Sequence, residues 1–206
     1  MSFAQWLPVF AVCLMGAMSP GPSLAVVLRN TTNGSRWHGI VTGLSHCIGI
    51  GIYAVAVTTG LVVLITETPS LFRVITWGGA AYLAWLGYKS FTAPAVSGDL
   101  TSDNNGTPKL TVTEAARQGF LISFLNPKIA VFFIALFSQF VIPGAGIAYQ
   151  SILALTAVIV DGAWYALVAV TISQPHILKH LRMRTALINK VTGVILVVIA
   201  TNALVS

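Results

Sequence analysis

Six long apolar runs dominate this 206-residue sequence and limit what it can fold into. They cover roughly residues 4–28, 38–65, 70–92, 115–142, 147–173 and 186–205. Each is long enough to cross about 30 Å of hydrocarbon as a helix, and none shows the alternation of an outer-membrane strand. Only 8% of the residues are charged, too few to cover a water-soluble domain. We therefore predict an all-α integral membrane protein with six transmembrane helices.

Basic residues gather on one side of these predicted spans. The loops after the first, third and fifth runs, with their flanks, hold nine Lys and Arg residues: Arg29, Arg36, Lys89, Lys109, Arg117, Lys179, Arg182, Arg184 and Lys190. The opposite loops hold only Arg73, and Lys128 lies inside the fourth run. Because cytoplasmic loops retain Lys and Arg, we expect the basic loops inside and both termini outside.

One polar stretch, residues 94–114, divides the six runs three and three. It is rich in Ser, Thr, Asn, Asp and Gly, which is typical of a flexible linker. Thr111 and Glu114 form a capping-box pattern that predicts the start of the fourth helix. The expected organisation is a three-helix unit in residues 1–93, a cytoplasmic linker in 94–114 and a second three-helix unit in 115–206.

Helix-breaking motifs occur at matched positions in the two units. Pro20-Gly21-Pro22 interrupts the first run and Asn126-Pro127 the fourth, and Pro20 and Pro127 lie 107 residues apart, about half the chain. A unit with an odd number of spans must be followed by an inverted copy, which is the plan of many secondary transporters. Proline frees backbone hydrogen-bonding groups at membrane depth, so the breaks are candidate substrate sites. A simple proline kink is the structural alternative.

Four separated segments add a signal of a different kind. They are residues 18–22 (MSPGP), 77–88 (WGGAAYLAWLGY), 126–133 (NPKIAVFF) and 137–140 (FSQF). In order, spacing and total length they are similar to the LysE/RhtB family of amino-acid exporters, and most to its homoserine and threonine branch. The resemblance implies proton-driven efflux of a small amino acid across the bacterial inner membrane. Other members export other amino acids or cadmium, so the substrate stays open.

Two charged residues lie deep inside predicted spans, away from the span ends. Asp161 is near the middle of the fifth run, where an unpaired charge is costly, and we expect it to bind protons or a substrate ammonium. Its structural alternative is an ion pair, with Lys128 as the first candidate partner. Lys128 follows the second break and could meet a substrate carboxylate, or its long side chain could extend toward the membrane interface.

Polar side chains flank both breaks. Ser19, Ser23 and Asn126 carry hydroxyl and amide groups suited to the ammonium and carboxylate of an amino acid. Capping of the broken helix ends explains the same residues equally well. We place them, with the residues of the two breaks, among the expected lining of the substrate path.

Helix two carries His46 and a stripe of small residues. His46 can titrate near neutral pH, but a lone histidine is more often structural, so its role in binding or coupling is left open. The stripe recurs every four positions, which favours close helix packing. It consists of Gly39, Gly43, Cys47 and Gly51.

Other functions are less well supported. No G-x-S-x-G or comparable arrangement indicates an intramembrane hydrolase, and no phosphate-binding loop indicates ATP hydrolysis. Cys13, Cys47, His46 and Asp161 are too scattered for a metal site, and we expect no cofactor. The scattered basic residues form no nucleic-acid patch. A channel remains a physical rival, and a homodimer is compatible with a chain this small, although no interface can be assigned.

Overall fold

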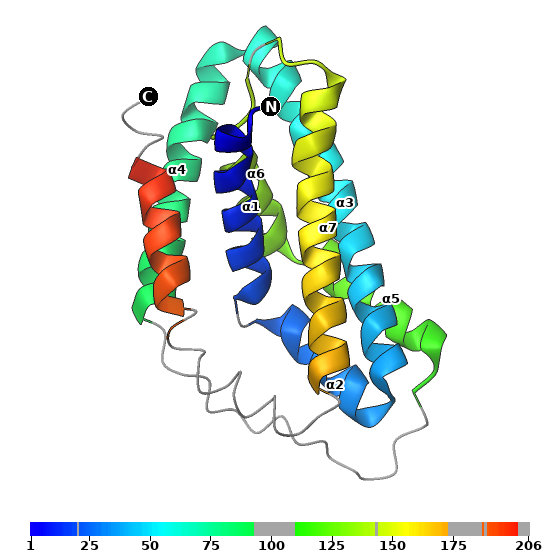
Figure 1. Cartoon of the computed structure of the whole chain (residues 1–206). Coiled ribbons are helices and arrows are strands. Elements are labelled where there is room, and N and C mark those ends of the chain that lie inside the picture. Colours follow the sequence, from blue (N-terminus) through cyan, green and yellow to red (C-terminus); the bar gives the residue numbers. More distant parts are fainter. Residues whose placement is uncertain (20, 93–109, 143, 173–186, 188, 202–206) are drawn as a thin grey trace.

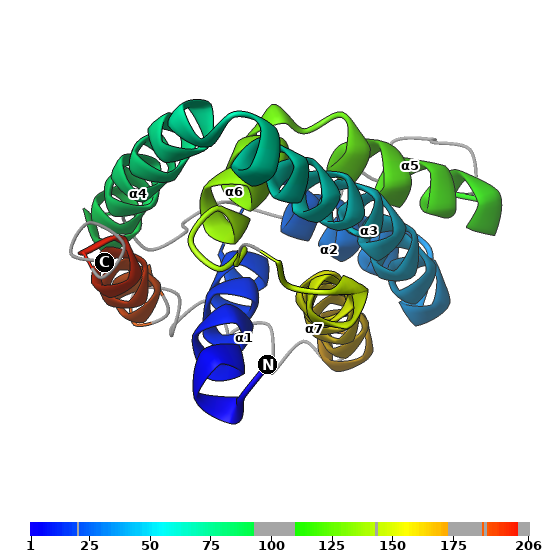
Figure 2. The same ribbon diagram turned by 90° about the horizontal axis from the view of Figure 1, so that it is seen from above.

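Helices provide all the regular secondary structure in the described part of the chain. The computed structural model describes residues 1–19, 21–92, 110–142, 144–172, 187 and 189–201, and these contain no β-strand. The helices form an elongated bundle (Figures 1 and 2). They are α1 (Phe3–Met18), α2 (Pro22–Asn33), α3 (Arg36–Glu67), α4 (Pro69–Thr92), α5 (Val112–Phe124), α6 (Pro127–Phe137) and α7 (Ile147–Ile172), followed by Asn189–Thr201, here called the C-terminal helix.

Both predicted helix breaks are present. α1 ends at Met18 and α2 begins at Pro22, with 58° between the two helices. α5 ends at Phe124 and α6 begins at Pro127, with a bend of 54°. Each proline lies in the first turn of the new helix, where its missing N–H removes no intrahelical hydrogen bond. The chain therefore changes direction twice at positions set by proline.

Length and composition support fewer membrane spans than the six expected. α3 and α7 are each long and apolar enough to cross a membrane. The bent pairs α1–α2 and α5–α6 also qualify if each pair counts as one span, which gives up to four. α4 carries Arg73 and Lys89 and the C-terminal helix is short, and neither meets the same criteria. The six-span count therefore stays a prediction.

α5 begins as the sequence predicts. The Thr111 side-chain oxygen accepts a hydrogen bond of 3.2 Å from the backbone N–H of Glu114. The Glu114 carboxylate accepts another, of 3.1 Å, from the side chain of Gln118. The N-terminal cap thus forms through Thr111. Residues 94–109 of the predicted linker lie outside the described residues.

α3 packs along α7 through the predicted stripe of small residues. A Cβ atom on Gly43 would lie 2.7 Å from the Cβ atom of Tyr165, and one on Gly51 would lie 3.2 Å from Val158. Rising residue numbers on α3 meet falling numbers on α7, so the two helices are antiparallel (Figure 1). Small side chains let the two backbones approach closely, as in many membrane bundles.

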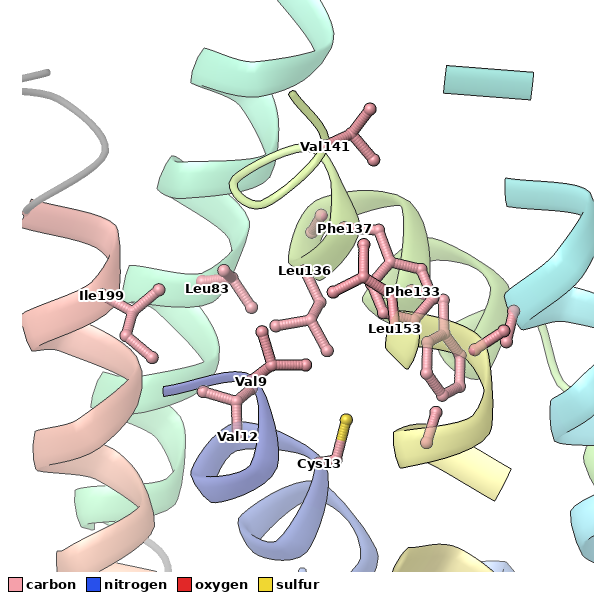
Figure 3. Close-up of a cluster of buried hydrophobic side chains, with 14 of the residues drawn as sticks. Val9, Val12, Cys13, Leu83, Phe133, Leu136, Phe137, Val141, Leu153 and Ile199 are labelled. Carbon is pink, nitrogen blue, oxygen red and sulfur yellow. The ribbon is translucent and has the colours of Figure 1, made fainter. Parts of the chain in front are cut away.

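Apolar side chains of α1, α3, α4, α6, α7 and the C-terminal helix meet in the main core (Figure 3). Leu83, Leu136, Phe137 and Leu153 are fully buried there. They come from α4, α6 and α7 and contact residues of α1 and of the C-terminal helix. This cluster holds the two broken helices against the rest of the bundle.

The start of α1 and the end of the C-terminal helix lie at the same end of the bundle (Figure 1). The turn between α2 and α3 lies at the opposite end. Arg29 and Arg36, two of the predicted cytoplasmic basic residues, flank that turn.

Candidate functional site

A cavity of about 120 Å³ lies where the two helix breaks meet α3 and α7. This is several times the roughly 10–15 Å³ that a single water molecule needs. Eight predicted site residues line it: Ser19, Gly21, Pro22, Ser23, His46, Asn126, Lys128 and Asp161. Pro127 opens α6 but does not line the cavity, and Pro20 lies outside the described residues. The structure thus brings residues of both halves to one site.

His46 and Asp161 are hydrogen-bonded to each other in the cavity wall. The Nδ1 atom of His46 lies 2.8 Å from Oδ2 of Asp161 and joins α3 to α7. Only 2% of His46 and 7% of Asp161 are exposed. The hydrogen-bonded partner of Asp161 is thus His46 and not Lys128, which was the first candidate for the structural alternative. The antiparallel contact of α3 with α7 places the histidine, rather than the lysine, against the carboxylate.

Tyr165 completes this group and was not predicted as a site residue. Its ring meets the His46 ring edge-on, with 4.9 Å between centroids. It lines the cavity together with Ser23, at the start of α2. A sequence signal for it exists, since Tyr165 follows Asp161 by four positions and therefore shares its helix face.

The second ring nitrogen of His46 has no partner. Nε2 is buried and makes no hydrogen bond among the residues that the structure describes. Buried polar atoms are usually satisfied, and an orphaned one at a cavity wall is a candidate for ligand contact. His46 therefore carries the clearest unused polar group of the site.

Lys128 brings a positive charge to the same cavity. It is an exposed residue in the first turn of α6 and forms no ion pair within the described ranges. Its backbone N–H donates to the Asn126 side chain at 3.0 Å, so Asn126 does cap the broken helix. α2 differs, because its N-cap residue Gly21 provides no side-chain hydrogen bond.

Three further polar residues of the cavity lining were not among the predicted site residues. Ser90 of α4 and Thr192 of the C-terminal helix face the cavity, as does Cys13 of α1. Isolated Ser, Thr and Cys residues in apolar helices give no distinct sequence signal. Among the described residues, no three His, Cys, Asp or Glu side chains lie close enough to hold a metal ion.

The site therefore combines opposite charges within a largely apolar bundle. Asp161 supplies a carboxylate, Lys128 an ammonium group, and the residues beside the breaks supply hydroxyl and amide groups. Charged groups at membrane depth are costly and usually mark substrate or ion pathways. This arrangement is complementary to a small molecule that carries both charges.

Comparisons with known proteins agree with this reading. The family described as LysE type translocator matches residues 14–206. A homoserine/homoserine lactone efflux protein of Salmonella typhimurium is 30% identical over 164 residues, which cover 78% of this chain and 77% of that protein. A threonine efflux protein of the same organism is 26% identical over 81% of each chain. A leucine efflux protein of Klebsiella pneumoniae is 31% identical over 69% of this chain and 66% of its own. No solved structure matches the chain. The chain belongs to the LysE type translocator family.

Proposed function

We propose that this protein is a secondary transporter that exports a small amino acid, with threonine or homoserine as the first candidates, across the bacterial inner membrane. The observation that carries the proposal is the cavity between the two helix breaks, which is lined by both Asp161 and Lys128. An amino acid is a zwitterion, and these two residues offer a countercharge to each of its ends. The relatives named for homoserine, threonine and leucine efflux support the same substrate class and a transporter rather than an enzyme.

Alternating access of two inverted three-helix repeats is the proposed mechanism of movement. Residues 1–93 and 115–206 form the repeats and 94–114 the cytoplasmic linker. Matched breaks support this organisation, and so do matched contacts, since α3 packs on α5 as α7 packs on α1. Rocking of one repeat against the other then exposes the cavity to each side of the membrane in turn.

Orientation in the membrane follows from the basic residues. We place the turn between α2 and α3 in the cytoplasm, because Arg29 and Arg36 flank it. The start of α1 and the end of the C-terminal helix lie at the opposite end of the bundle (Figure 1), which supports an external position for both termini. Proton entry from outside, where the pH is lower, then drives export of the amino acid. The proton is bound at the pair formed by His46 and Asp161.

Efflux from loaded bacterial cells tests this function. Cells that make the protein are loaded with a panel of labelled amino acids, and loss of each label is followed with and without a proton gradient. We expect the cells to lose labelled threonine or homoserine when a proton gradient is present. Gradient-dependent loss of another amino acid would keep the export function and identify that amino acid as the substrate. Flux of every small solute down its gradient, insensitive to protons, favours a channel.

Asp161→Asn is the matched variant for the proton-coupled step. It removes the negative charge with little change in shape, so we expect gradient-driven efflux to fall to background while membrane insertion persists. Glu67→Gln is the control, because Glu67 is an exposed carboxylate at the end of α3 and outside the cavity. Undiminished gradient-driven efflux in the Asp161 variant would contradict the role of this residue.

A further inference from the structure

We propose that the Nε2 atom of His46 is the point at which a proton and the substrate ammonium exclude each other, with Asp161 acting through the histidine as a positioning residue. This inference rests on the proposed export function and deepens it. The sequence alone placed proton binding on the Asp161 carboxylate, whereas this inference places it on the His46 imidazole.

The first step of the argument is the tautomer. If Asp161 is ionised, its carboxylate can only accept hydrogen bonds, and the Nδ1 atom 2.8 Å from Asp161 Oδ2 then carries the hydrogen. In a neutral imidazole the other nitrogen then holds a lone pair. That nitrogen, Nε2, is buried and has no partner among the described residues, and His46 lines the cavity. With that tautomer, His46 holds one unused hydrogen-bond acceptor of fixed direction, which is buried within a residue of the cavity wall.

Charge explains why only one cation can be held. Neutral His46 and ionised Asp161 together carry one negative charge. A substrate ammonium can donate an N–H to Nε2 and be stabilised by that charge. A proton on Nε2 instead uses the lone pair and neutralises the pair, so the ammonium loses both its acceptor and its countercharge. Proton and substrate are thus alternatives at one atom.

Neighbouring side chains surround the His46–Asp161 pair but make no hydrogen bond to it in the described structure. Tyr165 of α7 meets the ring edge-on and lines the cavity with Ser23 of α2. The other titratable residues that line the cavity are Cys13 of α1 and Lys128 of α6, while α4 and the C-terminal helix contribute Ser90 and Thr192. None of these is hydrogen-bonded to His46 or Asp161 in the part of the chain that the structure describes. Cys47 adjoins His46 on α3, and its thiol donates to the Leu44 carbonyl at 3.0 Å.

Because a single atom takes up the proton, one proton is exchanged for each amino acid. From outside, a proton adds to Nε2 while the Nδ1 hydrogen stays on its nitrogen, and no other bond changes. At the cytoplasmic side this proton leaves, and the lone pair is then free for the ammonium of the next amino acid. Each cycle moves one zwitterion out and one proton in. Export is therefore electrogenic and also responds to membrane potential.

Reconstituted full-length protein tests the competition. Exchange of labelled for unlabelled threonine across vesicles of equal internal and external pH is measured between pH 5.5 and 8, beside uphill transport driven by a pH gradient. For the native protein, competition by one proton at Nε2 predicts that the KM for exchange rises on acidification, by at most about tenfold per pH unit. Homoserine replaces threonine as the label if the cell assay selects it.

Two variants and a control separate the roles. His46→Gln keeps a hydrogen-bonding oxygen but cannot titrate, so exchange should continue at a reduced rate with a KM independent of pH, and uphill transport should be lost. Asp161→Asn should raise the KM at every pH. His38→Gln is the control, because His38 lies on the same helix, bonds to Ser35 and is outside the cavity. Retention of pH-driven uphill transport by His46→Gln would overturn the proposal.

A spectroscopic measurement decides the tautomer without relying on transport. Nitrogen-15 spectra of histidine-labelled native protein, with the His46→Gln spectrum subtracted, report where the hydrogen lies. We expect Nδ1–H with bare Nε2 at pH 8 and protonation of Nε2 on acidification. A hydrogen on Nε2 at pH 8 would contradict the inference whether or not the folded variant transports amino acids. Absence of amino-acid flux in the native protein would instead reject the export function and leave the tautomer to be judged by these spectra.

Discussion

Gly87 of α4 and Gly193 of the C-terminal helix meet backbone to backbone. A Cβ atom on Gly87 would lie 2.8 Å from the carbonyl oxygen of Gly193, and one on Gly193 would lie 2.6 Å from that of Gly87. The contact is reciprocal, and the two glycines are 106 residues apart, close to the 107 that separate Pro20 from Pro127. Equivalent positions of two inverted repeats are expected to meet in this way on the axis that relates them.

Replacement of Gly87 by alanine should therefore weaken this helix pair. The added methyl group meets backbone atoms that cannot move aside, and overpacking of this kind costs about 1–3 kcal/mol. Thermal unfolding of the purified protein in detergent measures the loss. Gly78→Ala on the same helix is the matched control, because nothing lies within 4 Å of a Cβ atom there. Equal stability of the two variants would show that the close contact is not part of the fold.

A buried polar cluster near the turn between α2 and α3 supports a second prediction. The Asn30 side chain donates to the Thr42 hydroxyl at 3.0 Å, and that hydroxyl lies 2.7 Å from the carbonyl oxygen of His38 and 3.2 Å from that of Ala115. This joins α2, α3 and α5. Thr42→Val leaves the Asn30 amide unpaired, which should cost about 1–3 kcal/mol of stability.

Thr59→Val is the control for the Thr42 variant. Thr59 is exposed on the same helix, and its hydroxyl bonds only to carbonyls of its own helix in the described structure. We expect its free energy of unfolding in detergent to stay within about 0.5 kcal/mol of that of the native protein, as is usual for surface changes. A Thr42 variant as stable as the Thr59 variant would argue against the cluster.

Lys128 should bind the carboxylate end of the substrate. Lys128→Met removes a hydrogen bond to a charged group, worth about 1.5–3 kcal/mol, so the KM for exchange should rise about 10- to 150-fold. Lys128→Arg should recover part of the loss. Lys89→Met tests for a general effect of lost positive charge, because Lys89 extends over the Trp85 ring, 5.1 Å from its centroid, and lies outside the cavity. Similar KM values for the two methionine variants would exclude Lys128 from binding.

Topology provides a prediction that is independent of transport. A reporter that is active only outside the cytoplasm should be active when fused after Ser206, and inactive when inserted at Asn105 in the linker. The expectation rests on the distribution of basic residues. Activity of the linker fusion, or a cytoplasmic signal from the C-terminal fusion, would overturn the orientation or the number of spans.

Helix positions and breaks could be predicted because their causes are local. Pro22 and Pro127 open new helices since proline lacks a backbone donor, and Thr111 caps α5 through a residue three positions away. The stripe of small residues on α3 likewise predicted a close contact with another helix, but it did not identify that helix as α7. These features need only a few neighbouring residues to be recognised.

The pairing inside the site depends on long-range packing. His46 and Asp161 are 115 residues apart and meet only because α3 and α7 cross in one register. Lys128 looked a better partner for Asp161 because its charge is permanent, whereas a histidine carries none when neutral. One clue was present: His46 follows Gly43 by three positions, so it lies on the face that the small residues present to α7.

The central claim is that this chain couples amino-acid export to protons through one cavity. The most direct measurement is uphill movement of threonine and homoserine in vesicles of purified protein after a pH jump, with Asp161→Asn and Glu67→Gln vesicles beside them. We predict accumulation against the amino-acid gradient for the native and Glu67 proteins and none for the Asp161 variant. Equilibration without accumulation, at the same rate in all three, would contradict the account.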